Sequence, residues 1–419
     1  MITKIKQQLK PIASSRLFLS LSLIISMALL MLSCETDDIL GLEENMQTLS
    51  GSYDDELILK NIFDDPAKVD YTVSGDMVVN DKLIIEAGVR IEFEEDLELQ
   101  ISADGVIIAE GTESDMITFT TANSEAGKYW KGLRIKSSDQ RNMLEHVKIE
   151  FAGNSNMNLG PYSSQNRQTN VGVDDDAALT ILNSHISDSK GYGLFVRGTL
   201  VEHHNNTYSS NASGTLSTHI QNAGEIDQES VYSGNGYDGP EIYGGVLQQE
   251  IQWSKLSQDA AYKIISDIEI EAALYITEGV NLEFDEDVLI EIKEGSGGSI
   301  NDGYIDVSGT ESNPVVFTTL NLAGGQHWKG IYVKTTDARN KMNNVIVEYA
   351  GNSNISIGPY SSQNRSTNIG IDSQASLEVA NAVIRNSKGW GLAAMESSSI
   401  QLESITYESN TEGDLTIVD

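Results

Sequence analysis

One block of sequence occurs twice in this chain of 419 residues. Residues 153–174 read GNSNMNLGPYSSQNRQTNVGVD, and residues 351–372 read GNSNISIGPYSSQNRSTNIGID. The same offset of 198 positions relates Trp130 to Trp328. A repeat of such a long period indicates a duplicated unit, and any fold assigned to the chain has to contain that unit twice.

Apolar and polar residues alternate along short stretches from about residue 71 onward. Val89, Ile91 and Phe93 are expected to face a core, because a period of two is typical of half-buried strands. The alternation continues at Leu97, Leu99, Ile101, Val106, Ile108, Ile117, Phe119, Leu133, Ile135, Val147, Ile149 and Phe151. No long stretch after the N-terminal segment has helical periodicity, so the sequence predicts an all-β protein.

The spacing of these strands favours a solenoid. Val106 follows Leu83 by 23 residues and precedes Leu133 by 27, and steps of that size suit coils of a few short strands each. An antiparallel sandwich or barrel is the alternative. We expect a first module over 71–216, a connecting segment over 217–261 and a second module over 262–419.

Five short runs carry a resemblance to a known fold. They are Ile85–Phe93 (IEAGVRIEF), Gly111–Phe119 (GTESDMITF), Trp130–Leu133 (WKGL), Val147–Gly153 (VKIEFAG) and Ser189–Gly193 (SKGYG). They resemble the right-handed parallel β-helix repeat proteins of the pectin-lyase-like fold, over about residues 71–216 and 262–419. The resemblance implies an all-β, right-handed parallel β-helix solenoid of two duplicated modules. That fold hosts lyases, hydrolases, epimerases and adhesins, so it does not select an activity.

The N-terminal residues 1–33 resemble a bacterial lipoprotein signal peptide. Four basic residues precede or open the uncharged apolar run Leu17–Leu32, which is short for a comfortable membrane span. The run ends in Met31-Leu32-Ser33-Cys34, which resembles a lipobox, and Cys34 is the one cysteine of the chain. We therefore expect Cys34 to be acylated and to anchor the protein in the outer membrane. An ordinary signal peptide with an incidental cysteine is the alternative.

The residues after Cys34 suggest which side of the membrane the protein faces. Glu35-Thr36-Asp37-Asp38 resembles the acidic surface-export signal of Bacteroidetes lipoproteins, which implies the cell exterior; the periplasmic leaflet is the alternative. Residues 34–70 are polar and acidic, and we expect an acidic tether and an N-terminal cap there.

The charge of the chain excludes two classes of partner. Acidic residues number 62 and basic ones 27, for a net charge of −35. A field of this sign repels nucleic-acid phosphate and anionic headgroups, so we expect no nucleic acid and no membrane contact beyond the lipid anchor. No glycine-rich phosphate loop opens a helix, so no nucleotide is expected. No cofactor is required, and calcium is the one candidate.

The duplicated loop supplies the candidate ligand contacts. Its Tyr, Gln, Asn and Arg side chains offer a flat ring, amides and a guanidinium, which suit sugar hydroxyls and carboxylates. The predicted contacts are Tyr162, Gln165, Asn166, Arg167, Tyr360, Gln363, Asn364 and Arg365. The alternative is a compact loop whose side chains satisfy its own backbone.

Acidic clusters supply candidate calcium ligands. Asp174, Asp175 and Asp176 offer carboxylate oxygens, although the second copy has Asp372-Ser373-Gln374 there. Calcium-dependent lyases of the resembled fold pair such a site with a basic residue. The candidate bases are Arg141, Lys190, Arg339 and Lys388. Solvated turn residues are the alternative account of these charges.

Other candidates have plainer interpretations. A glycoside hydrolase needs two carboxylates across the scissile bond, and Glu150 and Glu348, which recur in both copies, are interpreted as solvated outward residues. His203 and His204 are adjacent on a strand and should point to opposite faces, so no transition-metal site is expected. Trp130, like its counterpart, is expected to pack a turn against the coil.

These observations predict a lipid-anchored surface protein that binds glycan or another surface partner without catalysis. A polysaccharide lyase or glycoside hydrolase is the first alternative, and a structural surface spacer is the second. No catalytic residues are identified from the sequence.

Overall fold

The computed structural model describes residues 45–63, 65–122, 124–295 and 302–419. Within it, residues 46–419 form one compact unit. Cys34 and the predicted signal peptide lie outside the described residues. None of the helices in the described residues has the length and hydropathy of a membrane-spanning segment.

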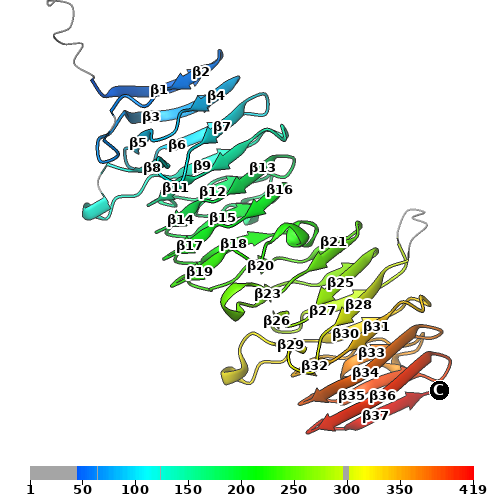
Figure 1. Ribbon diagram of the computed structural model, residues 1–419. Helices are drawn as coiled ribbons and strands as arrows, with labels where there is room; N and C mark the ends of the chain where they lie inside the picture. Colours follow the sequence, from blue (N-terminus) through cyan, green and yellow to red (C-terminus); the bar gives the residue numbers. More distant parts are fainter. Residues whose placement is uncertain (1–44, 64, 123, 296–301) are drawn as a thin grey trace, which may run out of the picture. The chain divides into compact units, whose positions relative to one another are not determined.

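Residues 46–419 form a solenoid in which every paired strand runs parallel to its neighbours (Figure 1). Each coil of the first copy gives one strand to each of three ladders, named a, b and c. Ladder a holds β5 (Arg90–Phe93), β8 (Ile117–Thr121), β11 (Val147–Glu150), β14 (His185–Ser187), β17 (Thr207–Ser209) and β19 (Val231–Ser233). Ladder b holds β6 (Glu98–Ile101), β9 (Gly132–Ile135), β12 (Thr169–Val173), β15 (Tyr192–Val196) and β18 (Gly214–Thr218). Ladder c holds β2 (Leu57–Leu59), β4 (Lys82–Ile85), β7 (Val106–Glu110), β10 (Met143–Glu145), β13 (Ala178–Leu182) and β16 (Thr199–His204).

The second copy repeats this arrangement in ladders a′, b′ and c′. Ladder a′ holds β23 (Tyr262–Ile264), β26 (Asn281–Phe284), β29 (Val315–Thr319) and β32 (Val345–Glu348). Ladder b′ holds β21 (Gly245–Leu247), β24 (Ile268–Ile270), β27 (Leu289–Ile292), β30 (Gly330–Val333), β33 (Thr367–Ile371), β35 (Trp390–Met395) and β37 (Gly413–Val418). Ladder c′ holds β22 (Ile251–Trp253), β25 (Ala273–Thr277), β28 (Tyr304–Ser308) and β31 (Lys341–Asn343).

A few long strands bend across two ladders. β1 (Gln47–Tyr53) and β3 (Tyr71–Val79) span ladders a and b, and β34 (Ser376–Arg385) and β36 (Ser399–Glu408) span c′ and a′. β1 and β2 lie in the range predicted to hold the tether and cap. The predicted fold class, a parallel β-helix solenoid built from two duplicated modules, is confirmed.

Asparagine side chains tie successive coils together at the corners. Asn142 accepts from the Ile107 N–H at 3.0 Å and donates to the Ala178 carbonyl at 3.1 Å. Asn340 accepts from the Ile305 N–H in the same way in the second copy. Such bonds satisfy buried backbone groups that no ladder reaches.

The inward positions predicted from alternation are mostly right, with one register error. Val89, Ile91 and Phe93 are buried as expected. In β7, however, Ile107 and Ala109 face the core and Ile108 does not, because Ile107 pairs with Leu83 of β4. A shift of one residue exchanges the two faces of a strand, so the interpretation of Val106 and Ile108 as an inward pair was wrong.

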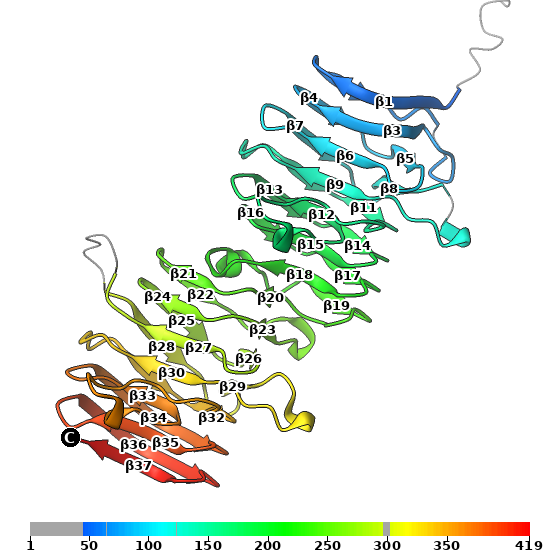
Figure 2. The same ribbon diagram turned by 180° about the vertical axis from the view of Figure 1, so that it is seen from behind.

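At the junction between the two copies, one ladder of the first copy continues as a different ladder of the second. Among the residues that the structure describes, ladder b alone runs through the junction. The short strand β20 (Glu241–Ile242) pairs with β18 on one side and with β23 of ladder a′ on the other. The 3-10 helix η3 (Ile220–Glu225) contacts β16, β21 and β22, and η4 (Ser257–Asp259) contacts β19. Figure 2 shows β18, β20 and β23 in succession from behind.

A buried carboxylate and a shared core hold this junction. Glu241 accepts from Tyr192 Oη at 2.8 Å and from Ser217 Oγ at 2.9 Å, and it pairs with Lys263 Nζ at 2.9 Å. Tyr192 belongs to the first copy and Lys263 to the second. One hydrophobic core cluster extends from Leu49 through the junction to Ala394.

Candidate functional site

The duplicated block forms a loop that leaves ladder a and returns to ladder b. In the first copy it connects β11 to β12, and in the second it connects β32 to β33. The base of each loop is closed by one antiparallel bridge, between Met157 and Arg167 or between Ile355 and Arg365. The tips contain the 3-10 helices η2 (Ser163–Gln165) and η6 (Ser361–Gln363).

Each loop lies down on the outer face of its sheet. Met157 and Leu159 are fully buried and cluster with Phe195 of β15. Gly172 makes room for them, since a Cβ there would lie 2.6 Å from Leu159 Cδ2. The apolar half of the loop is therefore packed, and its position is fixed.

The polar side chains at the tip mainly hold the loop together. Gln165 Oε1 accepts from the Tyr162 N–H at 3.0 Å. Arg167 Nη1 donates to the carbonyls of Ser164 at 2.7 Å and Asn166 at 2.9 Å, and its guanidinium lies 5.0 Å from the Phe195 ring centroid. This geometry agrees with a compact loop that satisfies its own backbone.

The second tip repeats these internal bonds. Gln363 accepts from the Tyr360 N–H at 3.0 Å, and Arg365 donates to the carbonyls of Ser362 and Asn364, both at 2.8 Å. Gln363 also donates to the Asp419 carbonyl at 2.7 Å.

The tyrosines are the exposed members of the predicted contact set. Tyr162 is 67% exposed and Tyr360 is 68% exposed, whereas the Gln, Asn and Arg of each tip are partly or fully covered. Because the loop is already held by its internal hydrogen bonds, an exposed aromatic ring on it loses little conformational entropy when a ligand binds. These rings are suited to stack on a flat ligand.

The first loop borders an open depression of about 310 Å³. Its lining residues are Arg134, Lys136, Gly160, Pro161, Asp174, Asp175 and Asp176. Arg134 binds Asp174 through two hydrogen bonds, of 3.0 and 2.7 Å, and Arg197 Nη2 lies 2.6 Å from Asp175 Oδ1. Lys136 and Asp176 have no ion-pair partner among the described residues, so their charges face the depression unpaired.

These ion pairs bear on the calcium prediction. Two of the three proposed ligands, Asp174 and Asp175, already hold guanidinium groups, which a calcium ion would have to displace. The three carboxylates also do not converge into a metal-sized group in the described part of the chain. The prediction of calcium at Asp174, Asp175 and Asp176 therefore gains no support from this geometry.

The corresponding region of the second copy is filled. Tyr332 stands where the first copy has Arg134, and its hydroxyl donates to Asp372 at 2.7 Å and contacts the Ser356 carbonyl. Met395 stands in place of Arg197 and packs in a cluster with Tyr332 and Ile357. The two loops thus share a sequence and differ in their surroundings.

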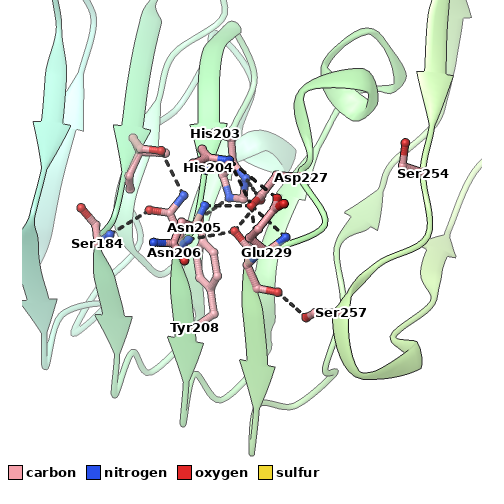
Figure 3. A network of polar contacts seen from close by, with 12 residues as sticks. Ser184, His203, His204, Asn205, Asn206, Tyr208, Asp227, Glu229, Ser254 and Ser257 are labelled. Atoms are coloured by element: carbon pink, nitrogen blue, oxygen red, sulfur yellow. Dashed lines mark hydrogen bonds and ion pairs between the residues drawn. The ribbon is translucent and has the colours of Figure 1, made fainter.

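A second polar cluster lies near the junction (Figure 3). His203 is buried and His204 is 57% exposed at its side chain, so the expectation that they face opposite sides is confirmed. His203 lies 3.1 Å from Asp227 Oδ1 and, at its other ring nitrogen, 2.9 Å from the buried Tyr208 hydroxyl. Asp227 could not be found from the sequence, because it lies 24 positions from His203 and no local motif marks it.

The imidazole of His204 and the carboxylates of Asp227 and Glu229 form the one metal-sized group in the described residues. Asp227, however, accepts from the N–H groups of Asn205, Glu229 and Ser230 and from the Ser230 hydroxyl, besides its contact with His203. Burial alone would raise the pKa of Asp227, but these bonds hold it well below its usual range. Because both carboxylate oxygens of Asp227 already accept hydrogen bonds, its role is to hold the neighbouring backbone and His203 in place.

The other candidate residues occupy structural positions. The interpretation of Glu150 and Glu348 as solvated was wrong: they are 7% and 8% exposed and accept from Thr120 and Thr318. Trp130 is fully buried, stacks on Phe93 with centroids 4.1 Å apart, and donates to the Glu150 carbonyl. The expectation that this tryptophan packs a turn is confirmed.

The four candidate bases also have hydrogen-bond partners within the protein. Arg141 and Arg339 form two-bond pairs with Asp139 and Asp337, two positions before them. Lys190 donates to Asn154 at 2.7 Å, and Lys388 donates to its counterpart Asn352 at 2.6 Å. Both copies keep the same contacts, which is typical of scaffold positions.

Three comparisons, with protein-family models, with curated proteins and with solved structures, returned no match for this chain.

Proposed function

We propose that this protein is a cell-surface lipoprotein with a right-handed, pectin-lyase-like β-helix that binds glycan without cleaving it. The observation that carries the proposal is the exposed ring of Tyr162 on a rigid loop tip beside the open depression; Tyr360 repeats the ring where that region is filled. Sugar rings stack on aromatic faces, and their hydroxyls bond to charged groups such as those in the depression beside Pro161.

The first loop is the better equipped of the two. Lys136 and Asp176 lie in its depression unpaired. Glycan hydroxyls could donate to the carboxylate of Asp176, and a glycan oxygen could accept from the ammonium of Lys136. The arginines at this site are held by aspartates, which leaves the depression close to neutral. We therefore propose a hydroxyl-rich glycan with few charges as the ligand class.

Anchoring through Cys34 on the outer face of the outer membrane completes the proposal. Labelled palmitate should enter the wild-type protein and not Cys34→Ala, because the thiol is the acylation point. Equal labelling of both would contradict the anchor.

The binding test uses the full chain in detergent micelles with a panel of neutral and acidic polysaccharides, with and without calcium. We expect retention of a neutral or weakly acidic glycan without shortened products. The double variant Tyr162→Ala, Tyr360→Ala should weaken retention. The matched control is Leu322→Ala, which removes an exposed apolar side chain elsewhere. Shortened chains would make the protein an enzyme, and neither retention nor cleavage would leave the spacer role.

A further inference from the structure

The second copy has an elongated groove where ladder c′ begins. Three open depressions, of about 500, 340 and 390 Å³, adjoin one another over β22 and β25, the first two strands of that ladder (Figure 2). The first and second share Glu250, and the second and third share Gln252, so together they form one groove, the junction groove. Its lining follows the chain from Gln248 to Lys255, about 20 Å if extended. Gln228, from the first copy, lines one end.

The junction groove lies where the ladders on this side of the two copies fail to meet. In the described residues ladder c ends at β16 and ladder c′ begins at β22, and η3 lies between them in contact with both. This helix packs closely on β22, since a Cβ at Gly224 would lie 3.1 Å from Ile251 Cβ. The outer edge of β22 is therefore covered, and a peptide could not add to it as a further strand.

The corresponding place in the first copy is filled by an ion pair. β2 pairs with β4 as β22 pairs with β25, so Glu56 corresponds to Glu250 and Lys82 corresponds to Ala273. Lys82 Nζ lies 3.3 Å from Glu56 Oε2. The methyl group of Ala273 cannot reach Glu250, whose carboxylate has no ion-pair partner in the described residues. The replacement of lysine by alanine thus opens the groove and leaves a carboxylate free inside it.

The side chains of the lining also differ between the copies. Gln248 and Gln249 replace two aspartates of the first copy, and Gln252 and Tyr275 replace two isoleucines on the outer face of the ladder. The replaced residues are Asp54, Asp55, Ile58 and Ile84. The side chains of Gln248 and Gln249 form no hydrogen bond with the described residues, so their amide donors and acceptors are free for a ligand.

The aromatic ring of the junction groove is held in place. Tyr275 is partly exposed, and its hydroxyl is hydrogen-bonded to that of Tyr304, whose ring it meets edge-on at a centroid distance of 5.8 Å. The guanidinium of Arg339 lies 3.9 Å from the Tyr304 ring centroid and is itself held by Asp337. A ligand that packs on Tyr275 therefore pays little to order the ring.

We propose that the junction groove binds a linear neutral glycan, at a second site apart from the loop at Tyr162. Hydroxyls of successive sugars would bond to the amides of Gln248 and Gln249 and donate to the free carboxylate of Glu250, while one sugar ring packs on Tyr275. The same carboxylate disfavours an acidic glycan, and the covered edge of β22 disfavours an extended peptide. The inference shares the ligand class of the proposed function and rests on different residues.

The test measures binding of cellohexaose, mannohexaose and xylohexaose, three linear neutral probes, by isothermal titration calorimetry with the full chain in micelles. The background is Tyr162→Ala with Tyr360→Ala, which removes the loop contribution. We expect at least one probe to bind, and its affinity to fall about tenfold or more when Ala273→Lys is added, because the lysine fills the groove and pairs with Glu250 as in the first copy.

Two further variants keep this test interpretable. Gln252→Ile places the first copy's residue at an exposed position and should also weaken binding, through the loss of an amide. The matched control is Lys82→Ala, the reciprocal change in the first copy, which should bind like the background. Circular dichroism checks that each variant is folded.

Three results would overturn the proposal. One is unchanged affinity in folded Ala273→Lys. Another is tighter binding of an acidic probe, hexagalacturonate, than of every neutral one. The last is no binding of any probe in the background, and retention by the wild type alone would then leave the loop proposal standing. Conversely, equal affinity in the wild type and the background, lost in Ala273→Lys, would support the junction groove and contradict the loop.

Discussion

The two copies of the loop carry the same eight residues, Gly160–Arg167 and Gly358–Arg365, in different surroundings. Both close on themselves through the same glutamine and arginine bonds. The first lies beside an open depression whose charged side chains nearly cancel, while the second packs against Tyr332 and Met395. The internal hydrogen bonds thus explain why the two loops have the same sequence. Any difference in glycan binding between them must come from the neighbouring residues.

The largest expected effect is on stability, from the buried tryptophan that both copies share. Trp130→Ala and Trp328→Ala should each destabilise the fold by about 3–5 kcal/mol, because each removes a fully buried indole. Urea unfolding followed by fluorescence gives the comparison. Similar losses in the free energy of unfolding would support an equivalent structural role for the two tryptophans. A small loss in one variant alone would contradict it.

Next in size is the network around Asp227. Asp227→Asn should cost about 1–3 kcal/mol at neutral pH, since it weakens the acceptor of several buried donors. Because the pKa of Asp227 is held below its unfolded value, its stabilisation is present above about pH 4 and is lost as pH falls. The free energy of unfolding, measured at neutral and at acidic pH, should fall less on acidification in the variant than in the wild type. Asp104→Asn, on an exposed turn, is the control, and an equal acid loss in Asp227→Asn and wild type would contradict this account.

A conversion variant tests whether the neighbours decide binding. Changing Arg134→Tyr, Asp175→Ser, Asp176→Gln and Arg197→Met gives the first depression the residues of the second copy and leaves Phe195 under the loop. We expect glycan affinity to fall about tenfold or more, with the loop unaltered. Unchanged affinity in a folded variant would show that the loop alone binds.

The smallest expected effect is that of a chelator. Because Arg134 and Arg197 hold Asp174 and Asp175, removing divalent cations should leave glycan retention unchanged. Equilibrium binding before and after chelation measures this. A clear loss, restored by calcium, would support the calcium site and contradict the ion-pair account.

The sequence predicted the features that depend on local pattern. Alternation at Val89, Ile91 and Phe93 predicted buried strand positions, and the 198-residue offset predicted the duplicated modules. It failed for β7, where the pairing of Ile107 with Leu83 set the register and alternation alone left it open.

Features that depend on contacts between coils were beyond the sequence. Arg134 meets Asp174 across 40 positions, and His203 meets Asp227 across 24. No local motif marks either pair, because coil length and register decide which side chains become neighbours. The passage of ladder b into ladder a′ through β20 has the same cause.

The most direct measurement compares Tyr162→Ala with Tyr360→Ala in glycan affinity, each in the otherwise unchanged full chain. The two rings are almost equally exposed, so their surroundings are the variable. The account predicts an affinity about three- to tenfold weaker for Tyr162→Ala, from the loss of stacking, and little change for Tyr360→Ala. Equal losses in the two variants, or no loss in either, would contradict it.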